Sequence, residues 1–210
     1  MAKIIVAINA SPRRNWNTDS LVNKAIEGAK SEGAEVRKFD LFRLEKFTGC
    51  MSCFKCKKKG YEGFCILKDG LRPVLNAILE SDGVIIGAPV YFGDLCAQFK
   101  LLYERLLFPF LTYNTDRISC NKRPIPVLLI TTCNARQDYY RDLMDNYKTQ
   151  FERFVGPTET MIASETMQVR DYSIYDWNMF DADQRIERHE KVFPLDLQRA
   201  YDLGVKQFKT

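Results

Sequence analysis

The 210-residue chain lacks several features that would place it in common functional classes. It has no apolar run of about 18 residues, the length that a membrane-spanning helix needs. Its single histidine, His189, excludes a site built from several histidine ligands. Basic residues are dispersed and the net charge is only +4, whereas a nucleic-acid partner usually requires a clustered basic stripe. No signal peptide precedes the first apolar segment, so we expect a cytoplasmic protein without nucleic-acid or membrane partners.

Two glycine-rich nucleotide-binding motifs are also missing. The chain has neither G-x-x-x-x-G-K-[ST] nor G-x-G-x-x-G. Residues 11–18 instead read SPRRNWNT, between an apolar run at residues 3–9 and an amphipathic segment. A helix that starts after such a loop offers free backbone N–H groups and a positive dipole end to an anion. We therefore expect a phosphate monoester here; the alternative is an ordinary loop with Asn17 or Thr18 as the helix cap.

Short apolar segments alternate with amphipathic segments along the chain. The expected strands are residues 3–9, 34–41, 83–88, 125–130 and 160–169. The expected helices have apolar faces within residues 22–29, 71–79, 95–106, 140–154 and 197–208. This alternation is typical of an α/β fold with a doubly wound parallel sheet between two layers of helices. Five strands fit the order 2-1-3-4-5, in which ligands bind outside the carboxyl ends of the first and third strands.

The expected strand order brings loops of different chemistry together. Residues 11–18 are polar, whereas residues 89–94 offer the rings of Tyr91 and Phe92 for stacking. Residues 131–135, after the fourth strand, would form a third wall. Taken alone, Tyr91 and Phe92 could equally be core aromatics, but their place after a switch-point strand favours contact with a ligand.

Four of the seven cysteines lie close together in the sequence. They are Cys50, Cys53, Cys56 and Cys65; the scattered ones are Cys96, Cys120 and Cys133. A disulfide framework is not expected in a cytoplasmic chain, and scattered cysteines are usually small buried hydrophobes. Two C-x2-C steps and a fourth cysteine suit a [4Fe–4S] cluster, and the lysines at residues 55–59 could offset its negative charge. A zinc ion held by the same thiolates and free cysteines remain the alternatives.

Three segments together resemble the flavodoxin-like NAD(P)H-dependent FMN reductases, especially their iron–sulfur flavoprotein branch. Residues 10–18 are similar to the family's G-S-P-R-x-x-G-N-T loop, residues 81–100 resemble its flavin-ring loop and following helix, and the third segment is the cysteine group. The likeness covers roughly the first half of the chain. Ala10 and Trp16 stand where the family usually has glycine, and the gap before Cys65 is longer than in the iron–sulfur flavoproteins. If position 16 requires a positive φ, tryptophan would strain the loop.

The resemblance implies FMN as cofactor, NAD(P)H as co-substrate and a redox function. The implied cofactor-binding residues, together with those of the neighbouring loops, are Ser11, Arg13, Asn15, Asn17, Thr18, Pro89, Val90, Tyr91, Phe92, Gly93, Thr131, Thr132 and Asn134. The implied cluster ligands are the four clustered cysteines. No side chain is assigned as a catalytic acid or base, because the cofactor carries the chemistry.

Three functions follow as hypotheses. The first is an FMN-dependent oxidoreductase that takes electrons from NAD(P)H or a redox protein and passes them on, through the cluster if one is bound. The second is a non-enzymatic, flavodoxin-like electron carrier that serves protein partners. The third is a flavin-free module that binds another phosphorylated ligand beside a structural zinc ion. We expect one flavodoxin-like domain over residues 1–210, with a cysteine-rich insertion at about 48–68 and a C-terminal extension from about 170. By analogy with relatives, we expect a homodimer or homotetramer.

Overall fold

The structure is a computed structural model that describes residues 2–61 and 63–209. Its parallel strands are β1 (Ile4–Asn9), β2 (Glu35–Asp40), β3 (Gly83–Tyr91), β5 (Val127–Thr132) and β6 (Thr158–Ala163). Its helices are α1 (Asn17–Ser31), α2 (Arg72–Glu80), α3 (Ala97–Leu107), α4 (Arg141–Phe154), α5 (Ala182–Lys191) and α6 (Phe193–Phe208). Four short 3-10 turns, η1 (Leu41–Arg43), η2 (Lys55–Lys57), η3 (Phe108–Phe110) and η4 (Gln137–Tyr140), lie in the connections.

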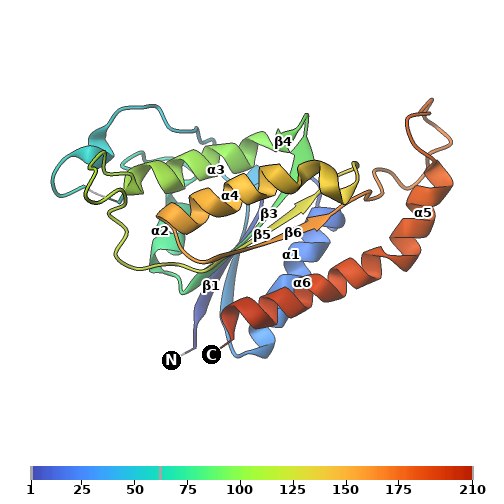
Figure 1. Cartoon of the computed structure of the whole chain (residues 1–210), viewed down its shortest axis with the longest axis horizontal. Coiled ribbons are helices and arrows are strands. Elements are labelled where there is room, and N and C mark those ends of the chain that lie inside the picture. The colour runs from blue at the N-terminus through green and yellow to red at the C-terminus, as the bar shows by residue number, and fades with distance from the viewer. Residues whose placement is uncertain (1, 62, 210) are drawn as a thin grey trace.

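The parallel strands run in the order β2-β1-β3-β5-β6, which confirms the doubly wound order expected from the sequence. The three central strands are apolar and almost completely buried, as expected for strands covered on both faces. Figure 1 shows α1 and α6 on one face of the sheet and α2, α3 and α4 on the other. Alternate residues follow this division: Val6 and Ile8 pack toward α3 and α4, whereas Ile5 and Ala7 pack toward α1 and α6.

A sixth strand, β4 (Asp94–Leu95), was not expected. It pairs antiparallel with the end of β3, so that β3 continues to Tyr91 and α3 begins at Ala97 rather than near Asp94. The reason is the two-residue turn between the strands, in which Phe92 and Gly93 both have positive φ angles, of 49° and 85°. Such a turn matches the twist of a tight hairpin, so the chain reverses before it can start a helix.

The C-terminal part differs from the expectation in two places. The last parallel strand ends at Ala163 rather than at residue 169. The segment after it leads to α5, which the sequence pattern did not indicate and which starts at an Asp181 cap that accepts N–H bonds from Asp183 and Gln184. None of the helices in the described part of the chain combines the length and apolar composition needed to cross a bilayer.

The β3–β4 hairpin is anchored to the helix layer through Asp94. Its carboxylate accepts hydrogen bonds from Tyr147 Oη at 2.5 Å and from Lys100 Nζ at 3.0 Å. Burial alone would raise the pKa of Asp94, but these hydrogen bonds outweigh it and lower the pKa. The anchor therefore depends on the ionised carboxylate.

Replacing Asp94 with Asn is expected to lower the free energy of unfolding by about 1 kcal/mol at neutral pH, because two charge-assisted bonds are weakened. The folded pKa lies below the unfolded value of about 3.9, so this stabilisation is present above that pH and is lost as the pH falls through the folded pKa. Thermal denaturation at pH 7 and pH 3 checks this: the gap between wild type and variant should close in acid. Asp116→Asn, at a carboxylate with no partner among the described residues, is the control. An Asp94→Asn gap that persists unchanged at pH 3 would contradict the ionic origin.

Candidate cofactor site

A cleft of about 250 Å³ opens at the carboxyl ends of the central strands. Its lining residues are Ser11, Arg13, Trp16, Asn17, Thr18, Pro89, Val90, Tyr91, Thr132, Cys133, Asn134, Thr166, Met167 and Gln168. The end of β3 and the loops that follow β1, β5 and β6 therefore meet at one place. Of the residues expected to bind a cofactor, Asn15, Phe92, Gly93 and Thr131 do not line the cleft.

The loop before α1 is held in shape by its own side chains. Ser11 N–H donates to Asn9 Oδ1 at 3.0 Å, and Arg13 N–H donates to Ser11 Oγ at 3.2 Å. Asn15 N–H donates to Asp19 Oδ2 at 2.8 Å. Among the described residues no side chain caps α1, so N–H groups of its first turn remain for an anion. The loop and helix end thus have the chemistry that an anion requires.

The backbone of this loop does not strain Trp16. Asn15 has the positive φ of 53°, whereas Trp16 is extended with φ of −115°. Asparagine tolerates the left-handed region better than most residues because its short side chain can bond locally. The glycine expected from the family pattern at position 16 is therefore not required here.

Two substitutions of Asn15 distinguish a requirement for its left-handed backbone from a requirement for its side-chain amide. Asn15→Gly keeps the left-handed backbone and is expected to leave FMN affinity within about twofold of wild type. Asn15→Val disfavours that backbone by about 1–2 kcal/mol and should weaken FMN binding about tenfold. Titration of apoprotein with FMN, followed by flavin fluorescence, measures both. Equal losses in the two variants would show that the amide itself is needed.

Arg13 joins the phosphate loop to a segment far along the chain. Its guanidinium lies 4.2 Å from the Trp16 ring centroid, and Nη1 donates to Gln168 O at 2.5 Å. Asn17 Nδ2 donates to Met167 O at 2.7 Å. The sequence pattern predicted a strand here rather than a part of the site, because Met167 and Gln168 belong to no motif and their role depends on contacts across about 150 positions. The segment contributes Thr166, Met167 and Gln168 to the lining of the cleft.

The loop after β5 supplies the third wall. Thr18 Oγ1 and Thr132 Oγ1 share a hydrogen bond of 2.7 Å that joins α1 to the end of β5, where this loop begins. Asn134 is held from α5, because Arg185 Nε donates to its Oδ1 at 3.0 Å and Arg185 Nη2 to its backbone oxygen at 3.2 Å. Thr131, which was expected in the site, instead donates to Ala88 O inside the sheet at 2.8 Å. Its hydroxyl is committed to the strand pair.

The two aromatic residues of the β3–β4 hairpin differ in their position relative to the cleft. Tyr91 lines the cleft, and burial raises the pKa of its hydroxyl, which stays protonated at neutral pH. Phe92 is fully exposed at the tip of the turn. Burial also raises the pKa of Cys133, on the facing loop, to about 11. Tyr91 and Cys133 are therefore neutral at pH 7, and Cys133 is not a thiolate nucleophile.

The four clustered cysteines line a second, smaller cavity. Its other lining residues are Met51, Phe54, Ile66, Leu67, Arg105, Phe108 and Pro109. Burial raises the pKa of the Cys56 thiol, and its thiol neighbours raise it further, while Lys57 opposes them. Ser52 and Phe54, on either side of Cys53, have positive φ angles of 51° and 54°, a conformation that costs energy in residues other than glycine. No group of three or more His, Cys, Asp or Glu side chains in the described ranges is arranged to hold a metal ion.

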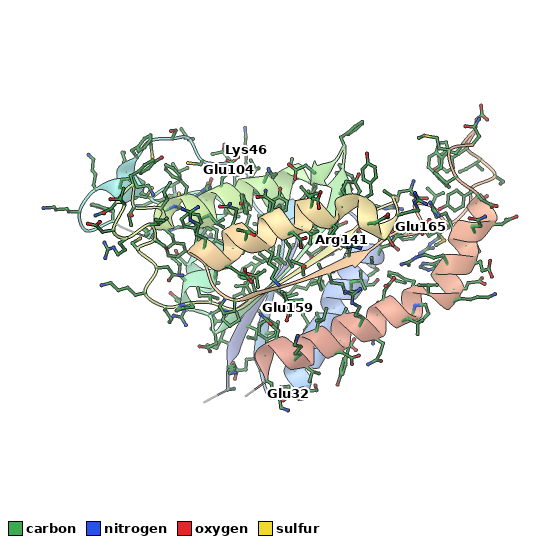
Figure 2. All side chains as sticks on the ribbon, viewed as in Figure 1. Glu32, Lys46, Glu104, Arg141, Glu159 and Glu165 are labelled. Atoms are coloured by element: carbon green, nitrogen blue, oxygen red, sulfur yellow. The ribbon has the colours of Figure 1, made fainter. Side chains whose placement is uncertain are left out.

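The two cavities lie at different ends of the molecule. Figure 1 shows the cyan segment that contains the cysteines at the C-terminal end of α3, whereas β4 and α5 lie at the other end. In Figure 2, Glu104 marks the cysteine side of the helix layer and Glu165 the cleft side. Glu104 accepts the Cys50 N–H at 3.0 Å, and Glu165 pairs with Arg185 at 3.1 Å.

The chain is similar to iron–sulfur flavoproteins over about half of its length. An iron–sulfur flavoprotein of Methanocaldococcus jannaschii is 38% identical over 101 residues, which are 48% of this chain and 50% of that protein. An iron–sulfur flavoprotein of Methanosarcina thermophila is 32% identical over 101 residues, 48% of this chain and 51% of that protein. The matched region thus spans about half the length of these curated relatives.

Solved structures show the same fold at low identity. An azoreductase from Bacillus anthracis superposes with a TM-score of 0.69 at 14% identity, covering 97% of this chain and 99% of that one. An NAD(P)H:quinone oxidoreductase from Methanothermobacter marburgensis gives a TM-score of 0.63 at 14% identity, covering 98% and 96%. A family model described as NADPH-dependent FMN reductase matches residues 4–148. With more than half of its length matched, the chain belongs to the NADPH-dependent FMN reductase family.

Proposed function

We propose that this protein is an FMN-dependent oxidoreductase that uses NAD(P)H. The observation that carries the proposal is the meeting of the α1 N-terminus, Tyr91 and the loop after β5 in one cleft. The first can hold the FMN phosphate and the other two can border its ring. When bound, FMN supplies the hydride and single-electron chemistry, and the protein supplies binding and orientation.

Different residues of the cleft are proposed to bind the phosphate and the ring of FMN. Ser11, Arg13 and Thr18 line the cleft, and their hydroxyls and guanidinium would hold the phosphate together with the first-turn N–H groups. The pairing of Thr18 with Thr132 keeps the phosphate wall and the ring wall at a constant spacing. No side chain moves a proton in this proposal. Tyr91 and Cys133 stay protonated near neutral pH and serve as ring contacts.

The four cysteines are proposed to bind a [4Fe–4S] cluster. They line one cavity whose remaining walls are mostly apolar; Cys56 is buried, whereas Cys53 is exposed. The strained backbone on both sides of Cys53 and the names of the relatives support the same assignment. The protein's part is to present four thiolates as ligands. A zinc ion at the same thiols is the competing outcome.

A second copy of the chain is proposed to cover the mouth of the cleft. Phe92 is fully exposed there, and the segment between β6 and α5 exposes Ile174, Trp177 and Met179. Exposed apolar groups of this size usually mark an interface. Light scattering after size exclusion should show a dimer or tetramer, and Phe92→Asp should shift the population toward monomer. A wild-type monomer at micromolar concentration would contradict this assembly.

Purification under strict anaerobiosis tests the proposed function. Bound flavin should give absorbance peaks near about 375 and 450 nm, with a broad brown shoulder if a cluster is present. Iron, acid-labile sulfide and zinc are measured on the same sample. Steady-state oxidation of NADH and NADPH with a quinone acceptor then separates an enzyme from an electron carrier, which would bind flavin without oxidising nicotinamide. A protein that binds no flavin after incubation with FMN would overturn the assignment.

A further inference from the structure

Arg105, on α3, is an unusual neighbour for a set of thiols. Only 1% of this residue is exposed, yet it lines the cavity of the four cysteines. A guanidinium stays charged in proteins, so this cavity holds a permanent buried cation. Burying a charge is costly unless its partners compensate for it.

The contacts of Arg105 enclose the cysteine segment from both sides. Nη1 pairs with Asp69 Oδ2 at 2.5 Å and donates to Thr48 O at 3.0 Å. Nη2 reaches Leu67 O at 3.4 Å. Thr48 precedes the first cysteine, whereas Leu67 and Asp69 follow the last. One side chain therefore joins both ends of the segment to α3.

The bonding of the guanidinium is incomplete. Arg105 Nε is buried and has no hydrogen-bond partner within the described part of the chain. Cys65 and the other three clustered cysteines line the same small cavity as Arg105. Asp69 compensates the cation through Nη1 and also accepts the Thr48 N–H at 3.2 Å. An anionic group ligated by Cys65 would complete the coordination of this cation.

We propose that Arg105 is the positioning residue that sets the reduction potential of the group bound by the cysteines. This rests on the proposed [4Fe–4S] assignment and deepens it. One electron arrives, from reduced flavin in the protein or from dithionite in a titration, and no bond is formed or broken. The electron adds one negative charge beside Cys65, and a buried cation stabilises that charge far more than a solvated one. Arg105 therefore raises the potential, and Asp69, as the nearest anion, lowers it.

Removing the charge of Arg105 and removing the charge of Asp69 should shift the midpoint potential in opposite directions. Arg105→Gln should shift the midpoint potential to more negative values, and Asp69→Asn should shift it to more positive values. The double variant should fall between the two, and Arg105→Lys, which keeps the charge, should remain closest to wild type. Potentials are measured by mediated titration followed by EPR, and the flavin potential of the same samples is the internal reference.

A merely structural role gives a different pattern. Arg105→Gln and Asp69→Asn would then both lose iron and melting temperature, while the potential of the remaining cluster stays at the wild-type value or moves in one direction. That result overturns the proposal. If Arg105→Gln does not fold, the sign of the Asp69→Asn shift still decides, because an unchanged or more negative potential contradicts the electrostatic role. A wild-type protein without iron and sulfide would instead refute the cluster assignment itself.

Discussion

Serine in place of Cys56 is expected to remove most of the iron and sulfide from the anaerobically purified protein. Cys56 is the most enclosed of the four thiols, with 7% of the residue exposed, and it lines the cavity together with Cys50, Cys53 and Cys65. A serine hydroxyl is a poor iron ligand, and a buried cluster with three thiolates is open to loss. Iron and sulfide should fall by about an order of magnitude or more, because the ligand set is incomplete.

The matched control is Cys120→Ser. Cys120 lies near the same loop, where its thiol approaches Pro109 O at 3.6 Å, but it does not line the four-cysteine cavity. The Cys120→Ser protein should keep its iron. Both variants should keep their FMN, because the cleft at the carboxyl ends of the central strands does not include these cysteines. Full iron content in Cys56→Ser, or equal loss in Cys120→Ser, would contradict the assigned ligand set. Stoichiometric zinc without sulfide would favour the structural-zinc alternative.

Alanine at Gly204 is expected to produce the largest loss of stability in the fold itself. A Cβ at this position would lie 2.2 Å from Ala25 O, so the backbones of α1 and α6 could not keep their distance. Gly28 makes the reciprocal approach, with a Cβ position 2.1 Å from Tyr201 O. Because backbone atoms cannot rotate away, the helices must separate. We expect a loss of about 2–3 kcal/mol, despite the better helix propensity of alanine.

For a chain of this length that loss corresponds to a melting temperature lower by about 4–12 °C. Arg199→Ala, at an exposed position of the same helix, is the control and should change stability by about 0.5 kcal/mol or less. Thermal and urea denaturation of the wild type and both variants provide the measurement. A Gly204→Ala protein as stable as wild type would show that α1 and α6 can move apart at no cost.

The sheet order and the phosphate loop were predictable because they depend on local patterns. Uninterrupted apolar runs such as residues 83–88 reveal central parallel strands, and their alternation with helices predicts a doubly wound sheet, for which the observed order is one of the common ones. The polar loop at residues 11–18 could be placed at the switch point for the same reason. The hairpin was missed because two consecutive positive φ angles, one of them at Phe92, are not evident from side-chain hydrophobicity.

Other parts of the candidate sites could not be predicted because they depend on segments far apart in the sequence. Gln168 reaches Arg13 from 155 positions away, and Arg185 holds Asn134 from 51 positions away. Polar residues in irregular segments carry no periodicity, so nothing in the sequence marks them as walls of a cleft. The domain boundaries and the roles of the individual site residues stay predictions for the experiments above.

The sequence by itself determined the layered parallel sheet and the place of the polar loop before the first helix, because short-range hydrophobic periodicity specifies the strands and helices. The strand order was one that five such strands fit, and the structure confirmed it. Only the tertiary structure decided which side chains share a cavity. In the structure Arg105 lines the same cavity as the four cysteines, and the residue with a positive φ in the loop before α1 is Asn15 rather than Trp16. The physical reason is that burial and hydrogen bonding are settled by packing between distant segments, which no local pattern encodes.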